Sequence, residues 1–180
     1  VRIITLSEDT KLNQGEKMPE MTMLGWFHTI LGIGAVLTGF YAIAKFKIIS
    51  LENKIGQIYV VLTAIVAGSA LGIYNQGGFG IAHILAVLTL IALVGAIVME
   101  KFKIFGGFSK YFQALGYTST FLFHMIPAIT DFLRRIPVGD PFVDSFEAPL
   151  LVNFQLSFLL IYFVGIIMQM IWLKKNGEIR

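Results

Sequence analysis

Long apolar segments alternate with short polar ones along this chain. The apolar segments cover residues 24–44, 57–73, 79–99, 111–130 and 151–173, and no Asp, Glu, Lys or Arg interrupts them. Each segment is close to the ~20 residues that an α-helix needs to cross the hydrocarbon core of a bilayer. The pattern therefore predicts an all-α fold, a polytopic transmembrane helical bundle with about five spanning helices.

The segment over residues 57–73 is the shortest, and Gly56, Gly68 and Gly72 weaken its helical pattern. A tilted or partly re-entrant helix is the alternative there. The same pattern divides the chain into an extramembrane N-terminal segment (1–23), the helical bundle (24–173) and a cytoplasmic tail (174–180). Three prolines and Gly139 predict a turn-rich outer cap loop at 131–150 inside the bundle region.

The amino-acid composition is typical of a protein whose surface lies in a lipid bilayer. Hydrophobic residues make up 56% and charged residues only 14%, against about 25% charged in a typical soluble domain. The chain contains no cysteine, which excludes disulfides, thiolate metal ligands and cysteine nucleophiles. The net charge is +3, but the lysines flank apolar segments, so we interpret them as topology signals and expect no nucleic-acid partner.

The basic residues also predict how the chain is oriented. They gather in the segment 45–54, in the segment 101–110 and after residue 173, whereas the two other connections have no excess of positive charge. Because cytoplasmic loops are enriched in Lys and Arg, these three ends are predicted to be cytoplasmic. The N-terminus then lies outside and the C-terminus inside, as a multi-pass protein of a bacterial inner membrane.

Small residues recur at a spacing that favours helix packing. Gly25, Gly32 and Gly39 repeat every seven residues, and Gly68 and Gly72 are four residues apart. In lipid, such positions let two helix backbones approach closely. We therefore expect both sets to lie at helix–helix contacts.

All three histidines, His28, His83 and His124, fall inside predicted spans, where ionisable side chains are rare. With alternating helix directions, their depths below the outer surface are roughly 6, 6 and 9 Å at 1.5 Å per residue. A polar stripe of Tyr117, Thr120, His124 and Asp131 follows one face of its helix. The three imidazoles are therefore predicted to share a layer near the outer leaflet.

Such a layer suits several ligands, which the sequence does not separate. Two imidazoles can hold haem b, and three can hold a transition metal, in either case for electron transfer. A quinone headgroup, or a lipid, would instead take hydrogen bonds from imidazole and Tyr117. Arg134 and Arg135 would hold propionates or an anionic headgroup. The plainer interpretation makes the histidines packing residues and the arginines members of ion pairs in the loop.

Other functions stay open, and no enzyme class is assigned. The chain has no nucleophile beside a base, no phosphate-binding loop and no carboxylate pair within a span. The absence of a carboxylate in any span counts against a proton-coupled transporter. The alternatives are a non-catalytic accessory subunit of a respiratory or photosynthetic complex, with other membrane subunits or a homo-oligomer as partners, and a small transporter or channel.

Two motifs carry a family resemblance. They are His28-Thr-Ile-Leu-Gly32 and Lys54-Ile-Gly56-Gln-Ile-Tyr59, within residues 25–100. This region resembles a family of small bacterial multi-helix membrane proteins of unknown function. That family often has a basic or histidine-containing pair before the second motif, where this chain has Glu52 and Asn53. The resemblance implies a helical bundle, with a loose analogy to cytochrome b561-type bundles.

Overall fold

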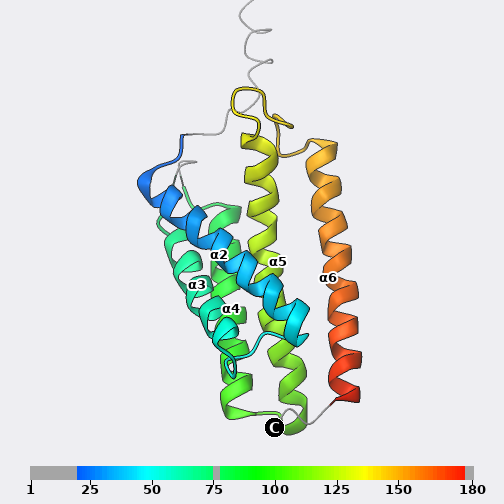
Figure 1. Ribbon diagram of the computed structural model, residues 1–180. Helices are drawn as coiled ribbons and strands as arrows, with labels where there is room; N and C mark the ends of the chain where they lie inside the picture. The colour runs from blue at the N-terminus through cyan, green and yellow to red at the C-terminus, as the bar shows by residue number, and fades with distance from the viewer. Residues whose placement is uncertain (1–19, 75–77, 177–180) are drawn as a thin grey trace, which may run out of the picture.

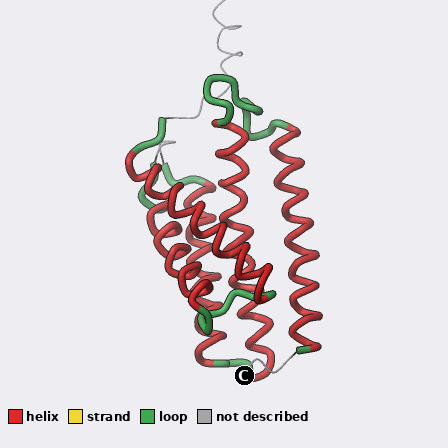
Figure 2. The backbone as a smooth tube through the Cα atoms, viewed as in Figure 1, coloured by secondary structure: helices red, strands yellow, loops and turns green. Residues whose placement is uncertain are grey.

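The computed structural model describes residues 20–74 and 78–176, and within them the chain forms five α-helices and no strand. These are α2 (Met23–Phe46), α3 (Lys54–Ala70), α4 (Ile81–Phe102), α5 (Ser109–Arg135) and α6 (Pro149–Lys175), with a short 3₁₀ helix at Gly106–Phe108 before α5 (Figures 1 and 2). The predicted all-α bundle is confirmed. Most of the predicted segment 1–23 and the end of the tail 174–180 lie outside the described residues.

Three of the helices, α2, α4 and α6, are long and apolar enough to cross a membrane. Helix α3 is apolar but shorter, at 17 residues. Helix α5 has 27 residues and is the most polar of the five, because one of its faces carries hydrogen-bonding side chains toward the interior. The described residues therefore form a helical bundle with three candidate transmembrane helices.

The helices pack mainly as neighbours in sequence. Helix α2 lies on α3, α3 on α4, and α4 along α5, while α6 packs against α5. Figure 1 shows α2 crossing the bundle obliquely, with α6 standing beside α5. Helix α5 contacts α2, α4 and α6, so its polar face lies inside the bundle.

Local capping decides where the helices begin. The Thr22 hydroxyl accepts from the Gly25 backbone N–H at 3.1 Å, and Asn53 Oδ1 accepts from the Gly56 N–H at 2.8 Å. Because Asn53 caps it, α3 begins at Lys54, three residues before the predicted start. Pro149 opens α6, where its missing N–H is not needed.

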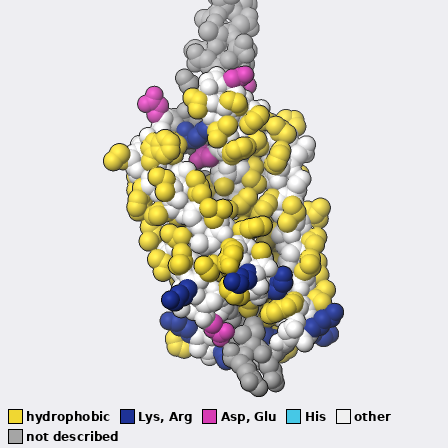
Figure 3. Space-filling view, viewed as in Figure 1, with side chains coloured by type: hydrophobic (Ala, Val, Ile, Leu, Met, Phe, Trp, Pro, Cys, Tyr) yellow, Lys and Arg dark blue, Asp and Glu magenta, His cyan; other side chains and the backbone are white. Residues whose placement is uncertain are grey.

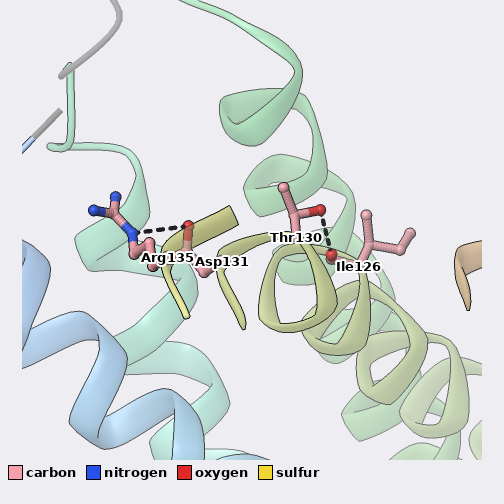
Figure 4. A network of polar contacts seen from close by, with 4 residues as sticks. All are labelled: Ile126, Thr130, Asp131 and Arg135. Carbon is pink, nitrogen blue, oxygen red and sulfur yellow. Dashed lines mark hydrogen bonds and ion pairs between the residues drawn. The ribbon is translucent and has the colours of Figure 1, made fainter. Parts of the chain in front are cut away.

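Helix α5 corrects the predicted cap loop at 131–150. The helix continues to Arg135, and Asp131 and Arg135 form an i,i+4 ion pair at 3.4 Å (Figure 4). One turn earlier, the hydroxyl of Thr130, the last residue of the predicted span, donates to the Ile126 carbonyl at 2.8 Å (Figure 4). The sequence pattern missed residues 131–135 because they are amphipathic rather than apolar.

Glycines permit the closest helix contacts. A Cβ on Gly39 would lie 2.6 Å from the Tyr59 ring and 2.9 Å from Phe121, and one on Gly116 would lie 3.0 Å from the Ala92 carbonyl oxygen. The expected packing role of the first glycine set therefore holds most clearly at Gly39. Gly68 has open space where a Cβ would be added, so the expectation is wrong there.

The surface separates into an apolar middle and a basic end. Large exposed hydrophobic side chains cover the lengths of α2, α4 and α6. In Figure 3, apolar side chains cover the visible middle of the bundle, and Lys and Arg gather toward its lower end. Apolar helix surfaces of this kind are consistent with contact with a lipid bilayer.

We predict that Gly39→Ala lowers the free energy of unfolding by about 1–3 kcal/mol, because the added methyl would overlap the Tyr59 ring. Thermal unfolding in detergent measures this loss. Gly68→Ala is the matched control, and it should be neutral or stabilising by about 0.5–1 kcal/mol because alanine is the better helix former. Equal destabilisation of the two variants would contradict the packing assignment.

Candidate functional site

The His28 ring lies on α2 and faces α3. Its Nδ1 is 3.1 Å from the Val66 carbonyl oxygen and 3.1 Å from the Ser69 hydroxyl. The Ser69 hydroxyl already donates to the Val66 carbonyl at 2.9 Å, so it can only accept from His28. Both contacts therefore require the proton on Nδ1. In the neutral ring, Nε2 carries the lone pair.

His124 approaches the same helix from α5. Its Nε2 is 3.1 Å from the Thr63 hydroxyl, and the edge of its ring meets Tyr59 with the centroids 6.3 Å apart. The side chain is only 8% exposed. His28 and His124 thus contact the same helix, α3, about one turn apart, at Val66 and Thr63. Two of the three predicted histidines therefore come together.

A buried hydroxyl pair continues inward from His124. The Tyr59 and Thr120 hydroxyls are 2.7 Å apart, and both side chains are fully buried. Thr120 donates its single proton to the Tyr117 carbonyl at 2.7 Å, so Tyr59 must donate to Thr120. Thr63 and Tyr59, four residues apart on α3, both contact the His124 ring.

The inner end of this arrangement is the carboxylate of Glu100, in the last turns of α4. It accepts from the Tyr117 hydroxyl at 2.7 Å, the Ser50 hydroxyl at 2.6 Å and the Leu51 N–H at 2.7 Å. Tyr117 therefore bonds Glu100 rather than a histidine. The prediction placed the end of this helix at Met99 and so left Glu100 outside it, although α4 continues to Phe102.

Together these groups form a polar column through the interior of the bundle. On α5 its members are spaced three or four residues apart, so they share one face. From Tyr117 to Asp131 this face covers about 21 Å along the helix axis. The polar column consists of His28, His124, Thr63, Tyr59, Thr120, Tyr117 and Glu100.

His83 has different neighbours from the other histidines. Its ring lies between Tyr74 and Phe79, at centroid distances of 4.7 and 5.0 Å, and its Nδ1 accepts from the Gly80 N–H at 3.1 Å. Across residues 20–74 and 78–176, no three His, Asp or Glu side chains lie together as a metal-ion site. The geometry gives the three-histidine metal site no support. Haem, metal and electron transfer stay predictions.

The two arginines hold the cap loop in place. Arg134 is 4% exposed, lies 3.8 Å from the centroid of the Phe146 ring and donates to the Asp144 carbonyl at 3.1 Å. Arg135 pairs with Asp131. The described contacts are those of the plainer interpretation, in which the arginines stabilise the loop. A headgroup or propionate contact for them stays a prediction.

Glutamine side chains fix the inner connection between α2 and α3. Gln169 on α6 accepts from the Thr118 hydroxyl at 2.9 Å and donates to the Lys47 carbonyl at 2.8 Å. Gln113 donates to the Ile49 carbonyl at 3.4 Å. Together with Glu100, they hold this connection against α4, α5 and α6.

Sequence reasoning missed Tyr59, Thr63 and Glu100. Tyr59 and Thr63 are four residues apart in an apolar segment, which was a detectable signal for an inward polar face. In the sequence, Glu100 is followed by Lys101 and Lys103, so it was assigned to the charged connection after the predicted segment 79–99. Only the packing of α4 against α5 brings its carboxylate to Tyr117.

Comparison with known proteins gives no match to a family model, to a curated protein or to a solved structure. The resemblance noted in the first half of the chain therefore stays a prediction. The assignment of a function depends on the geometry of the polar column.

We predict that Glu100→Gln loosens the inner connection. An amide offers one acceptor oxygen and an NH₂ donor, so it cannot accept all three donors that now point at the carboxylate. Losing one such bond costs about 1–3 kcal/mol, which corresponds to about 5- to 150-fold faster Leu51 amide exchange. Hydrogen exchange of the peptide over residues 47–54 measures it. Unchanged protection there would contradict the anchoring role.

Proposed function

We propose that this chain is a five-span protein of a bacterial inner membrane, with its N-terminus outside and its C-terminus cytoplasmic. Helix α3 is taken as a short span, and α5 as a span whose polar face is shielded by α2, α3 and α4. The lysine-rich ends of all five helices support this orientation under the positive-inside rule.

We further propose that the polar column conducts protons through the bundle. The observation that supports this function is the common direction of its donors. Tyr59, which lies beside His124, donates to Thr120, and Tyr117 donates to Glu100. These two phenol groups both donate on the side away from the histidine pair. A buried chain with one donor direction can pass a proton along by successive hops.

The hops can be written so that each atom is balanced. In this path His124 takes up a proton on Nδ1 and gives its Nε2 proton to Thr63, whose own proton moves to Tyr59. Tyr59 passes its proton to Thr120, whose hydroxyl turns from the Tyr117 carbonyl to pass its own proton to the Tyr117 hydroxyl. Tyr117 passes its proton to Glu100. The net change is one proton taken up at His124 and one gained by Glu100.

The ends of the column suit this role. At the outer end, His28 is only partly buried, so a proton can reach its imidazole from outside the bundle. At the inner end, Glu100 is also only partly buried and is followed in sequence by Lys101 and Lys103. The missing carboxylate that counted against a proton-coupled protein is thereby supplied by Glu100.

The topology predicts which sites are labelled from each side of the membrane. Because the chain has no cysteine, single cysteines introduced at Asp140 and at Lys175 report without background. A membrane-impermeant maleimide should label Asp140→Cys in intact cells and Lys175→Cys only after the membrane is opened. Labelling of both positions from the same side would overturn the five-span topology.

The proton path predicts a selective effect of removing one phenol oxygen. Tyr59→Phe keeps the packing but breaks the relay, and should reduce proton flux by about tenfold or more because a phenyl ring neither donates nor accepts. The flux is measured with a pH-sensitive dye inside liposomes under a potassium diffusion potential. Loss of flux with retained thermal stability is the expected result.

The matched control is Tyr162 on α6, which contacts α5 outside the polar column. Tyr162 is 2.8 Å from Ser119, which donates to the Leu115 carbonyl at 2.7 Å, so this tyrosine makes the same type of bond outside the column. Tyr162→Phe should leave the flux unchanged. Wild-type liposomes no more permeable to protons than empty ones would refute the function. A haem Soret band in the purified protein would favour the rival cofactor assignment.

A further inference from the structure

The polar column meets its surroundings at His28. Thr63, Tyr59, Thr120 and Tyr117 are fully buried, and His124 is nearly so. His28 is only partly buried, on α2 near the outer end of the bundle. At this end, therefore, a molecule from outside the bundle reaches the column at the imidazole of His28.

Only one atom of this imidazole remains for a ligand. Nδ1 donates to the Val66 carbonyl and the Ser69 hydroxyl, as the Ser69–Val66 bond requires. Nε2 therefore presents a lone pair and accepts hydrogen bonds, but it cannot donate one. A ligand at this atom must bring its own O–H or N–H group. This excludes a bare carbonyl as the partner of Nε2.

The surroundings select a ligand that dissolves in lipid. Leu24, one turn before His28, and Phe27 beside it are both exposed, at 39% and 50%. They lie on a helix long and apolar enough to cross a membrane. A charged or strongly hydrated donor is costly there. A neutral aromatic ring with a hydroxyl group fits both the apolar approach and the acceptor atom.

We infer that His28 is the binding site for the hydroxyl headgroup of a hydroquinone-class lipid. The hydroquinone O–H donates to Nε2, while Val66 and Ser69 hold the ring in the tautomer that accepts. This inference rests on the proposed proton path, because it names the molecule that meets the outer end of the column.

The proposed site distinguishes the reduced form of the ligand from its oxidised form. A hydroquinone has two O–H donors, whereas the oxidised quinone has only carbonyl acceptors at the same positions. The Nδ1–H tautomer of His28 thus favours the reduced form. One hydrogen bond gained by the reduced form corresponds to about tenfold tighter binding.

Titration calorimetry of the full chain in detergent, under argon, tests the selectivity with decyl-ubiquinol and decyl-ubiquinone as probes. The expected result is about tenfold tighter binding of the reduced probe to the wild-type protein. His28→Ala should abolish that difference, and His83→Ala, at a histidine with other neighbours, should leave it intact. Equal affinity of the wild-type protein for both probes, or no binding, would overturn the inference, whether or not His28→Ala folds.

The outcome is separable from that of the proton path. Flux through the column in liposomes free of quinone, together with no hydroquinone binding, would retain the proposed function and reject this ligand. Selective hydroquinone binding without any proton flux would retain the ligand site and reject the path. Selectivity that survives His28→Ala would place the probe elsewhere and also overturn the inference.

Discussion

The Glu100 carboxylate is the interaction on which the inner half of this bundle depends. A polar group inside a bundle of apolar helices needs a hydrogen-bond partner from the protein. Glu100 accepts from Tyr117 on α5 and from Ser50 and Leu51 in the connection between α2 and α3. One side chain of α4 thereby fixes the position of α5 and of the α2–α3 connection, and Gln169 adds α6 through Lys47.

The same requirement orders the rest of the polar column. Each hydroxyl has one proton, and where a backbone carbonyl takes it, the neighbouring group must donate. Thr120 and Ser69 are used in this way, and they determine the donor direction at Tyr59 and the tautomer of His28. The proposed proton transfer and ligand selectivity both depend on these assignments. The requirement that each buried polar group forms a hydrogen bond thus also determines which group of each pair is the donor.

Much of the fold was readable from the chain because its signals are local. Runs of apolar residues predicted five helices, and each is present with shifted ends. The shifts occur where a side-chain cap or an amphipathic turn sets the boundary, as at Asn53 and Arg135. The i,i+4 pairing of Asp131 with Arg135 was equally predictable, since helical geometry alone places the two side chains together.

The sequence by itself determined that this protein is a bundle of apolar helices, and it drew attention to His28, His124 and the polar face of α5. Hydrophobic length and helical period depend only on neighbours in the chain. Tertiary structure alone decided that His83 has other neighbours, that Gly68 lies at no close contact and that Glu100 meets Tyr117. Those outcomes depend on how helices distant in sequence rotate against one another, which no local pattern records.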